Sequence, residues 1–155
     1  MRILVLYETR RGFTLTVARA IRDELRSRGI DATAAPVGTV DEGTVAAADA
    51  FIVGSWTAGK VVAGVGPAEG ALQGIEALPR LGGRPAAVFC TFDVAPRGTL
   101  STLASRLIGR GAVVDVGGAF RNGPLARIGT KSLTKIPAFV DEVLAAFARV
   151  AAATG

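Results

Sequence analysis

The chain has 155 residues, of which 50% are hydrophobic and 20% are charged, which argues against disorder and favours one domain with a hydrophobic core. Its net charge of +5 is spread along the chain without a long basic run, so we expect no nucleic acid as a partner. The sequence has no histidine and one cysteine, Cys90, which excludes an internal disulfide and argues against a metalloenzyme or a hydrolase with a catalytic histidine.

Strand-like and helical segments alternate along the chain. A hydrophobic run over residues 2–7 predicts the first strand, and apolar residues at every fourth position predict a helix over 14–28, which Gly29 ends. The further predicted segments are, in order, a weak strand at 31–37, a helical turn at 42–48, a strand at 50–54, a helix at 70–78, a strand at 86–92, a helix at 99–110, a strand at 113–120 and a helix at 136–150.

Most of the predicted strands are continuous apolar runs, which is typical of parallel strands buried on both faces. Their alternation with helices predicts an α/β fold: a five-stranded parallel sheet, doubly wound, in three layers. We expect a single domain over 1–152 and a short C-terminal tail at 153–155. Because ligands of such sheets bind beyond the carboxyl ends of the strands, the loops at 8–14, 55–66 and 93–98 are the candidate site.

The first of these loops suits a phosphate group. Thr9, Gly12 and Thr14 fit a loop that wraps an anion at a helix N-terminus, where free backbone N–H groups and the helix dipole favour negative charge. Arg10 and Arg11 either add charge-assisted hydrogen bonds to that phosphate or remain solvated, and the sequence leaves both interpretations open.

The pattern Thr-x-x-Gly-x-Thr formed by these residues resembles the phosphate loop of the flavodoxin-like family, whose usual form is Ser/Thr-x-Thr-Gly-Asn-Thr. Arg11 and Phe13 depart from that form. The number of strands, the chain length and the spacing of the later loops extend the resemblance over nearly the whole chain. It implies the strand order 2-1-3-4-5 and bound flavin mononucleotide (FMN), with the phosphate in the first loop and the ring between the other two.

Aromatic residues stand where the resemblance implies the flavin ring. Trp56, the only tryptophan, directly follows a predicted buried strand and either stacks on the ring or serves as a core or dimer contact. Phe92 either stacks on the opposite face or ends the core of its strand. The resemblance implies the following cofactor-binding set: Thr9, Arg10, Arg11, Gly12, Phe13, Thr14, Ser55, Trp56, Thr57, Ala58, Gly59, Thr91, Phe92 and Asp93.

The leading hypothesis is therefore an FMN-binding electron-transfer protein with no catalytic residue and no metal. Its positive charge suggests an acidic redox partner protein and a less negative flavin potential than in acidic relatives. Two alternatives stay open: a small FMN-dependent oxidoreductase that reduces a quinone or a tetrapyrrole, and a flavodoxin-like scaffold that has lost FMN. We expect a monomer or weak homodimer in the cytoplasm, with no signal peptide and no membrane span.

Overall fold

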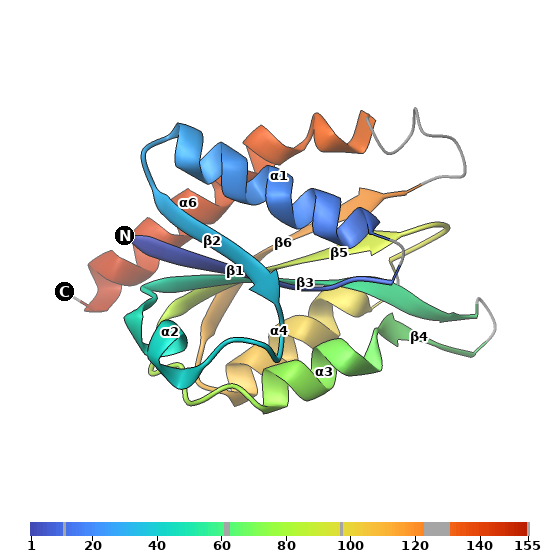
Figure 1. The fold of residues 1–155 in the computed structure, drawn as a ribbon, viewed down its shortest axis with the longest axis horizontal. Helices are drawn as coiled ribbons and strands as arrows, with labels where there is room; N and C mark the ends of the chain where they lie inside the picture. Colours follow the sequence, from blue (N-terminus) through green and yellow to red (C-terminus); the bar gives the residue numbers. More distant parts are fainter. Residues whose placement is uncertain (11, 61–62, 97, 123–130, 155) are drawn as a thin grey trace.

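Five parallel strands form the central sheet of the computed structural model, which describes residues 1–10, 12–60, 63–96, 98–122 and 131–154 (Figure 1). Their spatial order is β2-β1-β3-β5-β6, and a further strand, β4, pairs with β3 alone. The strands are β1 (Arg2–Glu8), β2 (Asp31–Pro36), β3 (Ala50–Lys60), β4 (Ala63–Pro67), β5 (Pro85–Phe92) and β6 (Val113–Arg121).

Helices cover both faces of the sheet. Figure 1 shows α1 (Phe13–Ser27) and α6 (Ile136–Thr154) on one face, and α2 (Glu42–Ala47), α3 (Glu69–Glu76) and α4 (Thr99–Gly109) on the other. The predicted three-layer, doubly wound α/β fold is thereby confirmed, and the parallel strands keep the predicted order 2-1-3-4-5 when β4 is left out of the numbering. The last helix includes residues 153 and 154.

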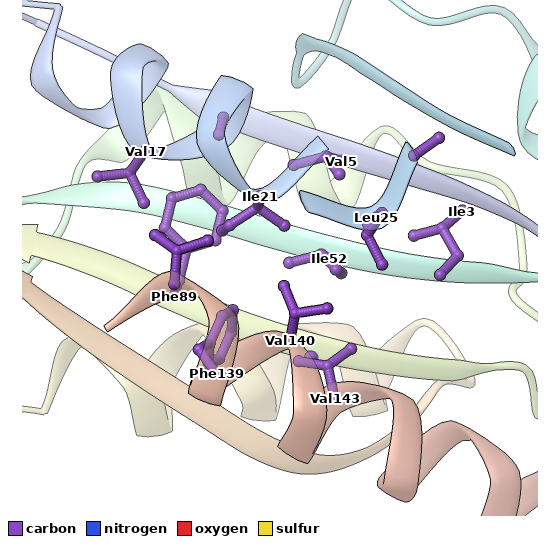
Figure 2. Packing of buried hydrophobic residues seen from close by; sticks show 14 of the residues in the cluster. Ile3, Val5, Val17, Ile21, Leu25, Ile52, Phe89, Phe139, Val140 and Val143 are labelled. Carbon is purple, nitrogen blue, oxygen red and sulfur yellow. The ribbon is translucent and has the colours of Figure 1, made fainter. Parts of the chain in front are cut away.

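The inner strands of the sheet alternate their side chains between two hydrophobic cores. Ile3 and Val5 of β1 face α1 and α6, whereas Leu4 and Leu6 face α3 and α4, and all four are at most 3% exposed. Because both faces are buried, the strands appear in sequence as continuous apolar runs. Figure 2 shows the first core, in which α1 and α6 side chains meet those of the sheet; its labelled members are Ile3, Val5, Val17, Ile21, Leu25, Ile52, Phe89, Phe139, Val140 and Val143.

The structure corrects the expectation of a loop over 55–66. β3 continues to Lys60 and the chain returns as β4, with Thr57 opposite Pro67 and Ala58 opposite Gly66 in antiparallel register. The hairpin escaped the sequence analysis because its residues are mostly Ala, Gly and Val, which carry no polar alternation that would mark a half-buried strand. Much of the second candidate loop is therefore paired strand. We call Thr57–Lys60 of β3 together with β4 the arm.

Within the described part of the chain, no helix has both the length and the apolar character needed to cross a bilayer.

Candidate functional site

A pocket of about 180 Å³ lies at the carboxyl edge of the parallel sheet, near the ends of β1 and β5 and where β3 leaves its parallel neighbours to pair with β4. Eight of the nine residues around it belong to the set predicted from the sequence, although they come from three segments far apart in the chain. The pocket is lined by Arg10, Phe13, Thr14, Trp56, Thr57, Thr91, Phe92, Asp93 and Asn122.

The N-terminus of α1 opens beside this pocket without a side-chain cap. Its N-cap residue, Gly12, has φ 89°, a left-handed conformation that glycine adopts without steric cost. The Gly12 N–H donates to Thr9 Oγ1 at 3.0 Å, which holds the loop closed ahead of the helix. The N–H groups of the first helical turn are thus left without a capping side chain, as an anion-binding helix end requires.

Phe13, which replaces the asparagine of the family pattern, lines the pocket and packs against the core between α1 and α6. Arg11, the other departure from that pattern, lies outside the described residues.

Two threonine hydroxyls meet at the pocket. Thr14 Oγ1 in the first turn of α1 lies 2.8 Å from Thr91 Oγ1 near the end of β5, and the two residues are 1% and 3% exposed. This hydrogen bond ties the start of α1 to the central sheet. Both residues also line the pocket.

Trp56 forms an aromatic wall of the pocket. Its ring packs against the core on the α3–α4 face, and the guanidinium carbon of Arg10 lies 5.3 Å from the ring centroid. A cation–π contact at an exposed arginine contributes on the order of 0.5–1 kcal/mol. Arg10 thus belongs to the loop before α1 and also lies beside the indole ring.

The residues around Trp56 differ in what their side chains can offer a ligand. The fully buried Ser55 hydroxyl donates to the Trp56 carbonyl at 2.7 Å and accepts from the Ala68 N–H at 3.0 Å, so it joins β3 to the start of α3. Thr57 lines the pocket, and its Oγ1 lies 3.1 Å from Thr99 Oγ1 in the first turn of α4.

Of the predicted set, five described residues are outside the pocket lining: Thr9, Gly12, Ser55, Ala58 and Gly59. The last two belong to the β3–β4 hairpin.

Asn122 is a pocket residue that the sequence analysis missed. Its N–H donates to the Phe92 carbonyl at 2.8 Å, which holds the chain after β6 beside the chain after β5. Phe92 is half-buried and Asp93 is exposed, and both line the pocket together with Asn122. The sequence could have predicted Asn122 as a site residue, because it directly follows a strand that must end at the same carboxyl edge as its parallel neighbours.

Cys90, next to Thr91 on β5, is buried and is a free cysteine. Burial raises the pKa of its thiol to about 12, and a hydrogen bond with Thr57 lowers the pKa in part. A thiol with so high a pKa is not a nucleophile near neutral pH. No group of His, Cys, Asp and Glu side chains suited to a metal ion occurs among the residues that the structure describes.

No family model matches the sequence, and no curated protein matches it significantly. Solved structures do match it. Flavodoxin 2 from Bacillus cereus, in its oxidised form, is 25% identical, with a TM-score of 0.72 over 96% of this chain and 99% of that one. A flavodoxin from Streptococcus pneumoniae TIGR4 is 19% identical, with a TM-score of 0.73 over 94% of this chain and 99% of that one.

A short-chain flavodoxin associated with a non-canonical PDU bacterial microcompartment is 18% identical, with a TM-score of 0.74 over 95% of this chain and 99% of that one. At such identities the likeness is one of fold, and it spans nearly the whole length of both chains.

Proposed function

Starting from the flavodoxin-like fold of this chain, we propose that the protein binds FMN at the pocket described above and transfers electrons to and from a partner protein. The observation that carries the proposal is the meeting of two features at one pocket. The first-turn residues Phe13 and Thr14 of the uncapped helix α1 line it, and so does Trp56 with its indole ring. A phosphate fits the first and a flat aromatic ring fits the second.

The phosphate half of the proposal rests on α1. The backbone N–H groups of its first turn donate to the phosphate oxygens, the helix dipole stabilises the negative charge, and the Thr14 hydroxyl adds a donor. Thr9 has a supporting role, because its hydroxyl already accepts from the Gly12 N–H and shapes the loop. Ser55 takes no part, since its hydroxyl has two backbone partners.

The ring half of the proposal rests on Trp56 and Phe92, with the polar side chains of Asp93 and Asn122 beside them. FMN, when bound, supplies a ring that takes up and gives back electrons. The protein's part is to hold that ring by stacking and to leave one edge accessible. The pocket of about 180 Å³ is smaller than the roughly 300–1,000 Å³ that encloses a whole drug-sized ligand, so the cofactor would lie partly outside it.

Arg10 gives this site a positive charge close to the ring position. A positive charge stabilises a reduced, anionic flavin, so we expect a less negative potential than an acidic pocket would produce. The net charge of +5 likewise favours a redox partner with an acidic surface, because opposite charges speed encounter.

The experiment that tests the proposal is a titration of the purified protein with FMN. The chain has one tryptophan, and it lies in the pocket, so its fluorescence reports on this site alone. We expect stoichiometric quenching of that fluorescence and flavin absorption bands near about 375 and 450 nm that stay with the protein on desalting. Trp56→Phe should keep an aromatic wall and bind FMN without the fluorescence signal.

A protein that remains colourless and whose Trp56 emission is unaffected by FMN would overturn the proposal in favour of a scaffold without flavin. If FMN binds, a second assay separates an electron carrier from a reductase. The carrier consumes little NADH or NADPH with a quinone acceptor unless a separate reductase is added, whereas a reductase turns over alone.

A further inference from the structure

The buried pair of Thr14 and Thr91 has one hydroxyl hydrogen more than its own hydrogen bond needs. The two Oγ1 atoms lie 2.8 Å apart, so one hydroxyl donates and the other accepts. Each threonine hydroxyl carries one hydrogen, and the accepting hydroxyl must therefore direct its own hydrogen elsewhere. Both residues line the pocket, which makes the pocket the natural direction for that hydrogen.

A phosphate fixes the direction of this hydrogen bond. Unprotonated phosphate oxygens accept hydrogen bonds and do not donate them. Thr14 belongs to the first turn of α1, where the uncapped N–H groups are, so its hydroxyl is the one placed to donate to an anion there. Thr91 must then donate to Thr14. The order of donation is Thr91 to Thr14 to phosphate, and each bond of such a chain strengthens the next.

Thr16, two residues further along α1, has a hydroxyl with no side-chain partner comparable to Thr91 in the described part of the chain, and it bonds to the helix backbone instead. Its Oγ1 donates back to the Gly12 carbonyl at 3.0 Å, four residues earlier in the chain. This back-bonding is the usual alternative for a hydroxyl on a helix. The residue four positions before Thr14 is Arg10, which precedes the N-cap residue Gly12 and therefore lies outside the helix. A donor at position 91 occupies a lone pair of the Thr14 oxygen and leaves its hydrogen for the pocket.

We propose that Thr91 is a positioning residue: it orients the Thr14 hydroxyl to donate to the phosphate of a flavin nucleotide, and so sets the preference for FMN over riboflavin. The inference rests on the proposed function and deepens it. Thr91 acts through Thr14, which is 77 residues away in the sequence. Phe92 and Asp93, which line the ring part of the proposed site, directly follow Thr91. The end of β5 is thereby coupled to phosphate binding at α1.

The test compares the dissociation constants of FMN and riboflavin, which differ only in the phosphate, measured by Trp56 fluorescence. We expect Thr91→Val to weaken FMN binding by roughly tenfold, the size of one lost hydrogen bond to a charged group, with riboflavin binding nearly unchanged. Thr91→Ser restores the hydroxyl and should restore the preference for FMN. Thr16→Val removes an exposed hydroxyl from the same helix and is the matched control.

A double-mutant cycle separates positioning from packing. If Thr91 acts through Thr14, then Thr91→Val has no further effect on the FMN-to-riboflavin ratio once Thr14→Val is present. The inference is overturned if Thr91→Val leaves the ratio unchanged, if it weakens both ligands equally, or if its effect persists in the Thr14→Val background. A wild-type chain that binds riboflavin and FMN equally overturns the inference alone, whereas one that binds neither overturns the proposed function as well.

Discussion

The ring of Phe89 on β5 fills the space beside Gly54 on β3, its direct neighbour in the parallel register. A Cβ atom at position 54 would lie 2.0 Å from Phe89 Cζ, which is far inside van der Waals contact. Figure 2 shows Phe89 among the residues of the core between α1 and α6. Because Gly54 directly precedes Ser55 and Trp56, the close approach of ring and backbone helps to fix where the pocket wall begins.

Gly54→Ala is therefore expected to destabilise the protein, since the ring of Phe89 is enclosed and has little room to move. Overpacking of this kind costs on the order of 1–3 kcal/mol. The free energy of unfolding in urea measures the effect. Gly66→Ala is the control, because a Cβ there would meet nothing within 4 Å. The double variant with Phe89→Leu should recover part of the loss, and equal stability of Gly54→Ala and Gly66→Ala would contradict the prediction.

Arg84 is expected to support the fold and not the site. Its Nη1 donates to the carbonyls of Val45 and Ala48, each at 2.7 Å, and its guanidinium carbon lies 4.9 Å from the Phe51 ring centroid. Arg84→Met keeps the length of the side chain but removes the donors at the end of α2. We expect a loss of about 2 kcal/mol in stability. FMN affinity should not change, and Arg149→Met, at an exposed position on α6, is the comparison.

The buried thiol of Cys90 predicts a loss of stability at alkaline pH. Its pKa is raised to about 12 in the folded state by burial. An unfolded cysteine has a pKa of about 8.5. Below the unfolded value both states are protonated and the contribution is complete. Between that value and about 12 only the unfolded chain loses the proton, so stability falls by up to about 1.4 kcal/mol per pH unit.

The measurement is the pH dependence of urea unfolding from pH 8 to 11 for the wild type and for Cys90→Ala. The difference between the two slopes isolates the thiol from lysine and tyrosine titration. Parallel curves would show that the thiol ionises equally in both states, against the prediction.

Arg10 is expected to influence both the tryptophan and the flavin. Arg10→Gln removes the cation that lies 5.3 Å from the Trp56 ring, so the emission of Trp56 without ligand should change. With FMN bound, the midpoint potential should become more negative. One charge about 10 Å away contributes about 0.8 kcal/mol at an effective dielectric of about 40, or roughly 20 mV for two electrons. Arg19→Gln removes the same charge from the exposed side of α1 and should leave both quantities unchanged.

The sequence predicts the sheet well because its strands are buried on both faces. The run from Ile3 to Leu6 can only be a parallel strand or a core helix, and its short length before a polar loop that holds Gly12 decides for the strand. The hairpin was not predictable in this way, since Ala58 and its neighbours have no polar alternation. Most other helix and strand ends differ from the prediction by one or two residues, whereas the last helix runs four residues further, to Thr154.

Most of the pocket residues could be predicted because parallel strands bring their following loops to one edge. What those side chains do could not. The partners of the Ser55 hydroxyl lie on α3 and on its own strand, and the partner of Thr14 is on β5, so only the folded chain decides which hydroxyls are already engaged. Asn122 was omitted because the turn that follows the last strand was not counted among the candidate loops, although that strand ends at the same edge.

β3 changes its hydrogen-bonding neighbours halfway along its length. As far as Ser55 it is paired with β1 on one side and β5 on the other, and from Thr57 onward its partner is β4. Amide protons of the first part exchange with deuterium only when the sheet opens, whereas those of the arm exchange through a smaller local opening. Trp56 stands at the junction of the two cooperative units. A ligand that stacks on Trp56 will therefore slow deuterium uptake in the arm while the interior of the sheet, already protected, keeps its rate.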